Sequence, residues 1–166
     1  MIGIKSLVVG CLLAAASASV FASSWHLIFS SDTDIAQFFD AESVEKSPDG
    51  VSVWLKLVRL NAADAQGVWS SAIKWRIHCT KKTIQWLARS EYDQNNKFIR
   101  SYEGSPKLKA IVPDSKGDEI ARIVCQPDFP RNTSEKDYIK VENNDVFIAA
   151  RVWAETLRDM LDKAPK

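Results

Sequence analysis

An acidic residue and a hydroxyl residue lie three positions apart at the end of the chain's second predicted strand. Asp40 and Ser43 follow the aromatic pair Phe38-Phe39 and have the residue types of an acid and a nucleophile. The same residue types open turns, because their side-chain oxygens accept hydrogen bonds from backbone N–H groups two or three residues later. We favour the turn interpretation, in which Val44 returns the chain to the core.

The sequence shows no other catalytic arrangement. His26 and His78 are isolated on separate predicted strands, and there is no nucleophile elbow, zinc-protease motif or phosphate loop. Paired carboxylates for glycoside hydrolysis stay open on spacing alone, but no feature points to them. We therefore predict a protein that is not an enzyme, with no catalytic residue, no cofactor and no bound metal.

Residues 1–22 have the pattern of a signal peptide. One lysine, Lys5, precedes a short apolar run, and small residues lead to a predicted cleavage between Ala22 and Ser23. The run is shorter than the roughly 20 residues that span a bilayer, which disfavours a membrane anchor. Lipidation at Cys11 is a second alternative, but the apolar run continues past that cysteine. We expect an exported mature chain with no transmembrane helix.

Export decides how the cysteines are interpreted. The predicted mature chain keeps Cys79 and Cys125, which are 46 residues apart (125 − 79). In an oxidising compartment an isolated pair forms a disulfide. A redox pair would have Cys-x-x-Cys spacing and a zinc site would need four ligands, so we predict a structural disulfide.

Composition limits the classes of function. The chain has 166 residues, 22 Lys and Arg, 21 Asp and Glu, and six tryptophans. This length predicts one domain with a substantial core. The balanced charge argues against a nucleic-acid-binding protein.

Alternating apolar and polar residues predict an antiparallel sheet. The clearest run is residues 73–80, in which Ile73, Trp75, Ile77 and Cys79 alternate with polar residues and face the core. Short turns join this run to its neighbours, so consecutive strands are expected to pair as a meander. The predicted strands are residues 25–30, 37–40, 51–60, 73–80, 84–92 and 98–102.

Two helices are expected after the strands. Ser115 is a suitable N-cap for a helix that ends near Cys125. Residues 126–144 are polar and are predicted to be a linker. Asp145 then caps a helix to about residue 163, whose apolar residues follow a heptad pattern. This helix is expected to dock on its own sheet, with a dimer through residues 146–164 and membrane-surface binding as alternatives. The apolar positions are Val146, Ala150, Trp153, Leu157, Met160 and Ala164.

Charge is unevenly distributed along the chain. Residues 51–110 contain eleven Lys and Arg against four acids, whereas residues 23–50 contain one Lys against six acids. A basic sheet face with an aromatic residue nearby suits an acidic polymer or an acidic protein; the alternative is a solvated face offset by acids of the last helix. Trp54 and Trp69 are the candidate exposed aromatics. The candidate ligand face comprises Lys74, Arg76, His78, Lys81, Lys82, Arg89 and Trp69.

Several short motifs occur in the order found in a known family. The chain resembles the surface-adhesin protein E family of Gram-negative bacteria over about residues 25–126. The resemblance implies an antiparallel sheet with a packed helix, and a disulfide between a strand and that helix. The motifs begin with the Trp25 strand and continue with Phe38-Phe39-Asp40-Ala41-Glu42-Ser43-Val44, Val51-Ser52-Val53-Trp54, Ile77-His78-Cys79, Glu91-Tyr92-Asp93, Val112-Pro113-Asp114-Ser115 and Ile123-Val124-Cys125.

These observations predict an α+β protein in three parts. Residues 1–22 are the cleaved signal, 23–126 the adhesin-like domain, and 127–166 a linker with an amphipathic C-terminal helix. The expected function is binding of a protein or acidic polymer outside the cytoplasm, on the cell surface or outer membrane or in the periplasm. The alternative is a periplasmic structural or assembly module that acts through the C-terminal helix.

Overall fold

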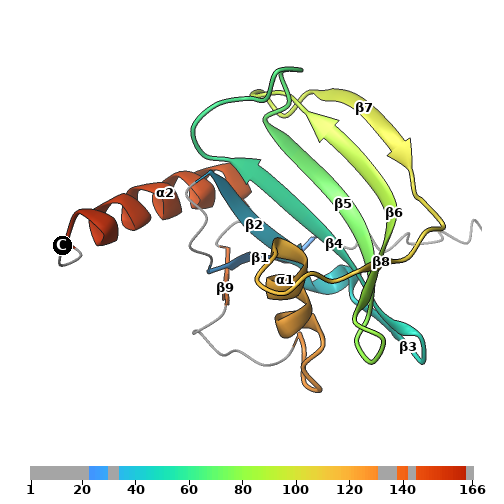
Figure 1. The fold of residues 1–166 in the computed structure, drawn as a ribbon. Helices are drawn as coiled ribbons and strands as arrows, with labels where there is room; N and C mark the ends of the chain where they lie inside the picture. The colour runs from blue at the N-terminus through green and yellow to red at the C-terminus, as the bar shows by residue number, and fades with distance from the viewer. Residues whose placement is uncertain (1–22, 30–33, 131–137, 142–144, 164–166) are drawn as a thin grey trace, which may run out of the picture.

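A computed structural model describes residues 23–29, 34–130, 138–141 and 145–163. The predicted signal segment, with Cys11, lies outside the described residues. The described chain forms one antiparallel sheet with two helices and a short 3₁₀ turn, which confirms the predicted α+β class (Figure 1). The helices are α1 (Lys116–Val124) and α2 (Val146–Asp162), and the turn is η1 (Ala41–Ser43).

The strands pair mostly with their neighbours in sequence, as a meander requires. The sheet order is β7-β6-β5-β4-β2-β1-β9, with β3 paired to β4 and β8 paired to β6. The strands are β1 (Trp25–Ile28), β2 (Ile35–Asp40), β3 (Glu45–Ser47), β4 (Gly50–Arg59), β5 (Ser70–His78), β6 (Thr83–Tyr92), β7 (Phe98–Glu103), β8 (Lys109–Ala110) and β9 (Tyr138–Lys140).

The two faces of the sheet carry two separate cores. Residues directly opposite in an antiparallel pair share a face, so Val53 and Leu55 of β4 lie on the same face as Trp75 and Ile73 of β5. We call this the α1 face, because α1 packs there through Ile120, Ile123 and Val124. The opposite face, the α2 face, carries Leu27, Ala36, Phe38 and Val58 against Val146 and Ala150 of α2.

A disulfide ties α1 to the sheet. Cys79 follows β5 and Cys125 caps the C-terminus of α1, and the two are bonded with their Cα atoms 5.6 Å apart. At the other end of α1, the Ser115 Oγ accepts a hydrogen bond from the Asp118 N–H at 3.3 Å. The predicted cap, helix and strand-to-helix disulfide are therefore all present.

The turn interpretation of Asp40 and Ser43 is confirmed. The Asp40 carboxylate accepts hydrogen bonds from the backbone N–H groups of Ser24 at 2.8 Å and Glu42 at 3.2 Å. The Ser43 hydroxyl donates to the Asp40 carbonyl at 2.7 Å and accepts from the Trp54 N–H at 2.9 Å. Both side chains thus satisfy backbone groups where the chain leaves β2.

The segment predicted as a linker contributes a strand. β9 pairs with β1, and Tyr138 at its start is buried in the α1-face core. A three-residue strand between polar segments is too short for an alternating pattern to identify. Residues 127–163, where described, therefore belong to the same folded body as the sheet.

The C-terminal helix docks on its own sheet. Val146, Ala150 and Leu157 are buried, and Trp153 stacks on Phe29 with 5.2 Å between ring centroids. Met160, in the same heptad pattern, is 49% exposed. The C-terminal end of α2 extends away from the sheet (Figure 1), so docking uses mainly the first part of the helix.

Candidate ligand-binding surfaces

Three residues of the predicted ligand face lie together on the α2 face. Lys74, Arg76 and His78 alternate along β5, and Lys74 is directly opposite Trp54 of β4. Trp54 is half-buried there. The strand alternation therefore brings basic side chains and one tryptophan to a common surface.

Protein groups already engage the cations of this face. The Lys74 ammonium lies 2.9 Å from the Glu45 carboxylate, and the Arg76 Nε donates to the Ser52 hydroxyl at 3.3 Å. Lys56, on the same face, lies over the Phe147 ring at 4.9 Å, and burial lowers the pKa of its ammonium group. Of these three cations, Lys74 is offset by an acid, and the other two are held by neutral groups of the protein.

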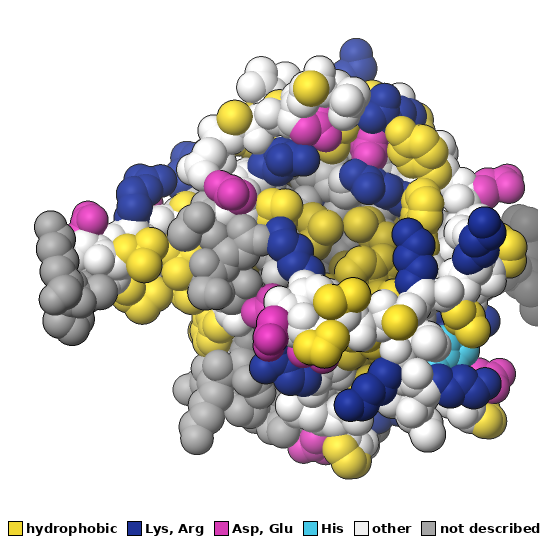
Figure 2. Space-filling view, viewed as in Figure 1, with side chains coloured by type: hydrophobic (Ala, Val, Ile, Leu, Met, Phe, Trp, Pro, Cys, Tyr) yellow, Lys and Arg dark blue, Asp and Glu magenta, His cyan; other side chains and the backbone are white. Residues whose placement is uncertain are grey.

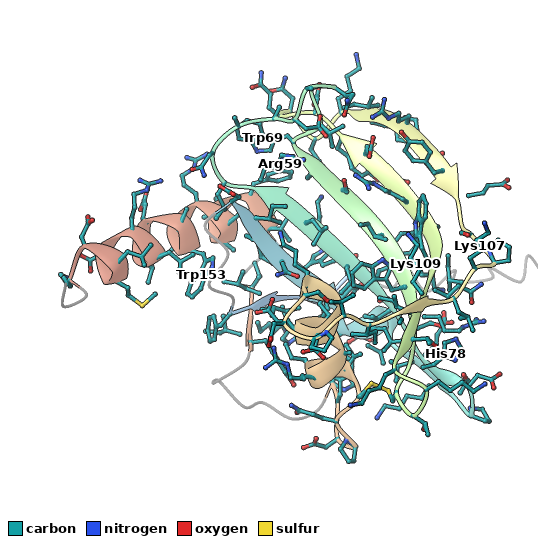
Figure 3. All side chains as sticks on the ribbon, viewed as in Figure 1. Arg59, Trp69, His78, Lys107, Lys109 and Trp153 are labelled. Atoms are coloured by element: carbon teal, nitrogen blue, oxygen red, sulfur yellow. A yellow bond between two sulfur atoms is a disulfide. The ribbon has the colours of Figure 1, made fainter. Side chains whose placement is uncertain are left out.

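The turn at the end of β5 carries the next predicted residues. Lys81 and Lys82 are exposed in the β5–β6 turn, where Lys82 has a φ of 47°. His78 and Lys81 line a cavity of about 370 Å³ beside the disulfide. His78 lies at the end of the sheet next to the disulfide (Figure 3), so these residues continue the positive charge of β5 to the end of the sheet.

The structure places Arg89 on the other face of the sheet. A register shift in the β5–β6 pairing at Lys74/Trp75 changes the alternation of β6, so Arg89 lies opposite Ile73 on the α1 face. A β-bulge of this kind adds one residue to a strand and redirects the side chains that follow it. Arg89 therefore does not belong to the Lys74 surface. Trp69 packs against the α2-face core, on the same face as Lys74, and is half-buried.

The α1 face has a second surface, beside α1. Figure 2 shows a hollow there, with an apolar floor and several Lys and Arg side chains around it. By strand register, Ile73, Trp75, Trp86 and Tyr102 lie on this face with Arg89, Glu91, Arg100 and Lys109. Lys109 and Arg59 lie on opposite sides of the hollow (Figure 3). We call this surface the α1-face hollow.

A buried carboxylate holds two arginines of the hollow. Glu91, with a side chain 4% exposed, accepts from Arg89 through one oxygen and from Arg100 through the other, both at 2.6 Å. Arg89 also donates to the Ser71 hydroxyl at 3.2 Å. The hydrogen bond to Glu91 raises the pKa of the Arg100 guanidinium. Two fixed cations thus share one anion.

Aromatic rings lie next to the arginine pair. The Arg100 guanidinium carbon is 5.6 Å from the Tyr102 ring centroid, and the rings of Tyr102 and Trp86 are 6.3 Å apart. Tyr102 is 41% exposed. We call Trp86, Arg89, Glu91, Arg100 and Tyr102 the β6–β7 cluster. It offers a ligand both positive charge and apolar ring surface.

Local sequence patterns do not identify these residues as neighbours. Arg100, Tyr102 and Lys109 lie within the basic segment, but they belong to short strands whose pairing is not visible in the sequence. Only the pairing of β6 with β7 and β8 brings them beside Arg89. The signal available in the sequence was the excess of basic residues in 51–110.

His26 contributes to packing of the α1-face core. His26 stacks on Phe39 with ring centroids 4.9 Å apart, and burial lowers the pKa of the imidazole.

Within the described ranges, no group of three or more His, Cys, Asp or Glu side chains is arranged to hold a metal ion. No helix in the described part of the chain is long and apolar enough to cross a membrane.

Comparison with known proteins agrees with this architecture. The model of the family described as surface-adhesin protein E matches residues 25–126, which is 102 of the 166 residues. The matched region includes both disulfide cysteines, α1 and the strands of the α1-face hollow. No curated protein and no solved structure matches the chain significantly. The chain belongs to the surface-adhesin protein E family.

Proposed function

We propose that the chain is an exported, non-enzymatic protein that binds an acidic ligand outside the cytoplasm through the basic part of its sheet. Family membership supports a surface-adhesin-like binding role. The observation that carries the finer proposal is the α1-face hollow, where Arg89, Arg100 and Lys109 surround aromatic side chains. We place the protein on the cell surface.

Positive charge together with the exposed ring of Tyr102 favours the α1-face hollow over the α2 face as the contact surface. On the α2 face, Glu45 offsets Lys74, while Arg76 and Lys56 are already engaged by a serine hydroxyl and an aromatic ring. In the hollow, Glu91 offsets two arginines, and Lys109 has no salt-bridge partner within the described residues. Unmatched positive charge attracts anionic ligands and accelerates their association.

This proposal predicts that neutralising the hollow weakens binding to polyanions. We expect the variant R100Q/K109Q to bind immobilised heparin and poly-glutamate about tenfold more weakly, or about 1.4 kcal/mol. The matched variant K74Q/R76Q loses the same formal charge from the α2 face and should change binding less. Biolayer interferometry at several salt concentrations measures both effects, because ion pairs weaken as salt rises.

Two results would contradict the proposal. Equal weakening by both variants would show that net charge, rather than the hollow, determines binding. Absence of binding to either polyanion at low salt would remove the acidic-ligand function itself.

A second candidate function is assembly through α2, with a second copy of the chain as partner. Ile148 and Val152 of α2 are 59% and 56% exposed, and Ile139 of β9 is 46% exposed. They line an apolar groove of about 510 Å³ between α2 and the sheet edge. Arg151 and Arg158 alternate along α2 with acids, so two antiparallel copies of the helix present opposite charges to each other.

Assembly predicts a dimer that depends on this groove. Size-exclusion chromatography with light scattering should give the mature protein twice the monomer mass. The variant V152K should be a monomer, because the dimer would bury an unpaired lysine, which is unfavourable. R158K keeps the charge of exposed Arg158 and serves as the control. A monomeric wild-type protein across the concentration range would exclude self-association through α2.

A further inference from the structure

The β6–β7 cluster holds its arginines in place without cancelling their charge. Glu91 is buried and accepts one hydrogen bond from Arg89 and one from Arg100, so the cluster keeps one excess positive charge. Charge-assisted contacts of this kind fix the guanidinium planes. The terminal nitrogens of Arg100 have no hydrogen-bond partner within the described residues. They remain available to a carboxylate or sulfate.

Two further donors in the cluster lack acceptors. The Nε of Arg89 and the indole Nε1 of Trp86 are shielded from solvent and have no hydrogen-bond partner among the described residues. Buried donors without acceptors are unfavourable. Both residues are neighbours of Tyr102: Arg89 lies directly opposite Tyr102 in the β6–β7 pair, and the Trp86 ring contacts the Tyr102 ring. Both N–H groups therefore add positive electrostatic potential beside Tyr102, where an anionic group would sit.

The cluster also offers flat apolar surface. Tyr102 is 41% exposed and lies between the Trp86 ring and the Arg100 guanidinium. Trp75, directly opposite Trp86, continues the aromatic surface across to β5. Aromatic rings contribute to binding through their faces as well as through buried area. The matching ligand therefore has a rigid apolar face beside its negative charge.

Further cations extend the positive charge around the hollow. Lys109 of β8 lies opposite Ile84 on the α1 face, and Lys107 precedes it in an exposed loop (Figure 3). The ammonium groups of both lysines have no salt-bridge partner within the described residues. A ligand with repeated charges would contact several of these cations at once, and linked contacts strengthen each other.

We propose that the β6–β7 cluster binds a sugar chain that carries carboxylate or sulfate groups. A sugar ring presents a rigid apolar C–H face next to its charged substituents, and the chain repeats this arrangement. An acidic peptide supplies similar charges, but it has no rigid apolar face for Tyr102 and Trp86. This inference rests on the proposed acidic-ligand function and names the class of ligand.

The test separates the ring contribution from the charge. The probes are a heparin oligosaccharide and a poly-glutamate peptide of equal charge, measured by isothermal titration calorimetry with the mature protein. Wild type should bind the oligosaccharide more tightly than the peptide. Y102L, which changes no charge, should weaken oligosaccharide binding about fivefold and leave peptide binding unchanged.

Phe98 supplies the matched control. It is an exposed aromatic of the same strand, but it contacts Tyr92 on the α2 face. F98L should leave binding of both probes unchanged.

The remaining outcomes identify which proposal fails. Equal or tighter binding of the peptide, or no effect of Y102L on the oligosaccharide, would overturn the sugar-chain assignment and leave acidic-ligand binding intact. Binding of neither probe would overturn both.

Discussion

Replacing both Cys79 and Cys125 with serine is expected to lower the free energy of unfolding by about 4 kcal/mol. The disulfide closes a loop of 46 residues. In the chain-entropy model, a loop of this length accounts for the expected loss, because the unfolded chain gains freedom when the bond is removed. Free energies of unfolding in urea, with and without a reductant, measure the change. The effect is large because domains of this kind are stable by only about 5–15 kcal/mol.

The reductant supplies the control. It should destabilise wild type by a similar amount and leave the double-serine variant unchanged. An unchanged urea midpoint for reduced wild type would contradict the structural role of the bond. Loss of the bond should also loosen α1, which packs on the sheet through one apolar stripe that ends beside Cys125.

Phe39→Ala is the second substitution with a large expected effect, about 3–5 kcal/mol of stability. Phe39 is fully buried, and its ring contacts His26, Phe129 and Tyr138, each with centroids 4.9 Å apart. These partners come from β1, the segment after α1, and β9. Removing the ring therefore leaves a cavity where three distant parts of the chain meet.

Thermal unfolding and near-ultraviolet circular dichroism measure this effect. Phe98→Ala is the control, because Phe98 is 56% exposed and surface changes of this kind cost within about 0.5 kcal/mol. A loss below about 1 kcal/mol for Phe39→Ala, or equal losses for the two variants, would show that Phe39 does not organise the core.

Much of the sheet was predictable because it is regular. The alternation from Ile73 to Cys79 fixed the inward face of β5, and the structure buries Ile73 and Ile77 on that face. The two long helices were also predictable, since Ser115 and Asp145 both cap them as expected. Strong periodicity and capping are local properties, so a single sequence carries them.

The candidate site was less predictable because it depends on pairing. Arg89 changes face through a register shift, which strict alternation does not anticipate. Arg100 and Lys109 join Arg89 only through β7 and β8. β9 is three residues long and is separated from its partner β1 by most of the chain. Such contacts depend on the tertiary fold rather than on local pattern.

The fold and the proposed function are connected through the two sheet faces. α2 and its core occupy part of one face, and α1 with the disulfide occupies part of the other. The hollow is the remaining surface beside α1, and its cations come from strands that pair side by side. A rigid sheet thus holds the arginines and aromatic rings at fixed spacing, which lowers the entropy cost of binding.

The six tryptophans test in one titration whether the α1-face hollow is the binding surface. Heparin oligosaccharide is added stepwise to the ¹⁵N-labelled protein, and the indole N–H signals are followed by NMR. Binding in the hollow should shift the signals of Trp75 and Trp86 on the α1 face and leave that of Trp54 on the α2 face unchanged. Shifts confined to Trp54, or to Trp153 of α2, would contradict it.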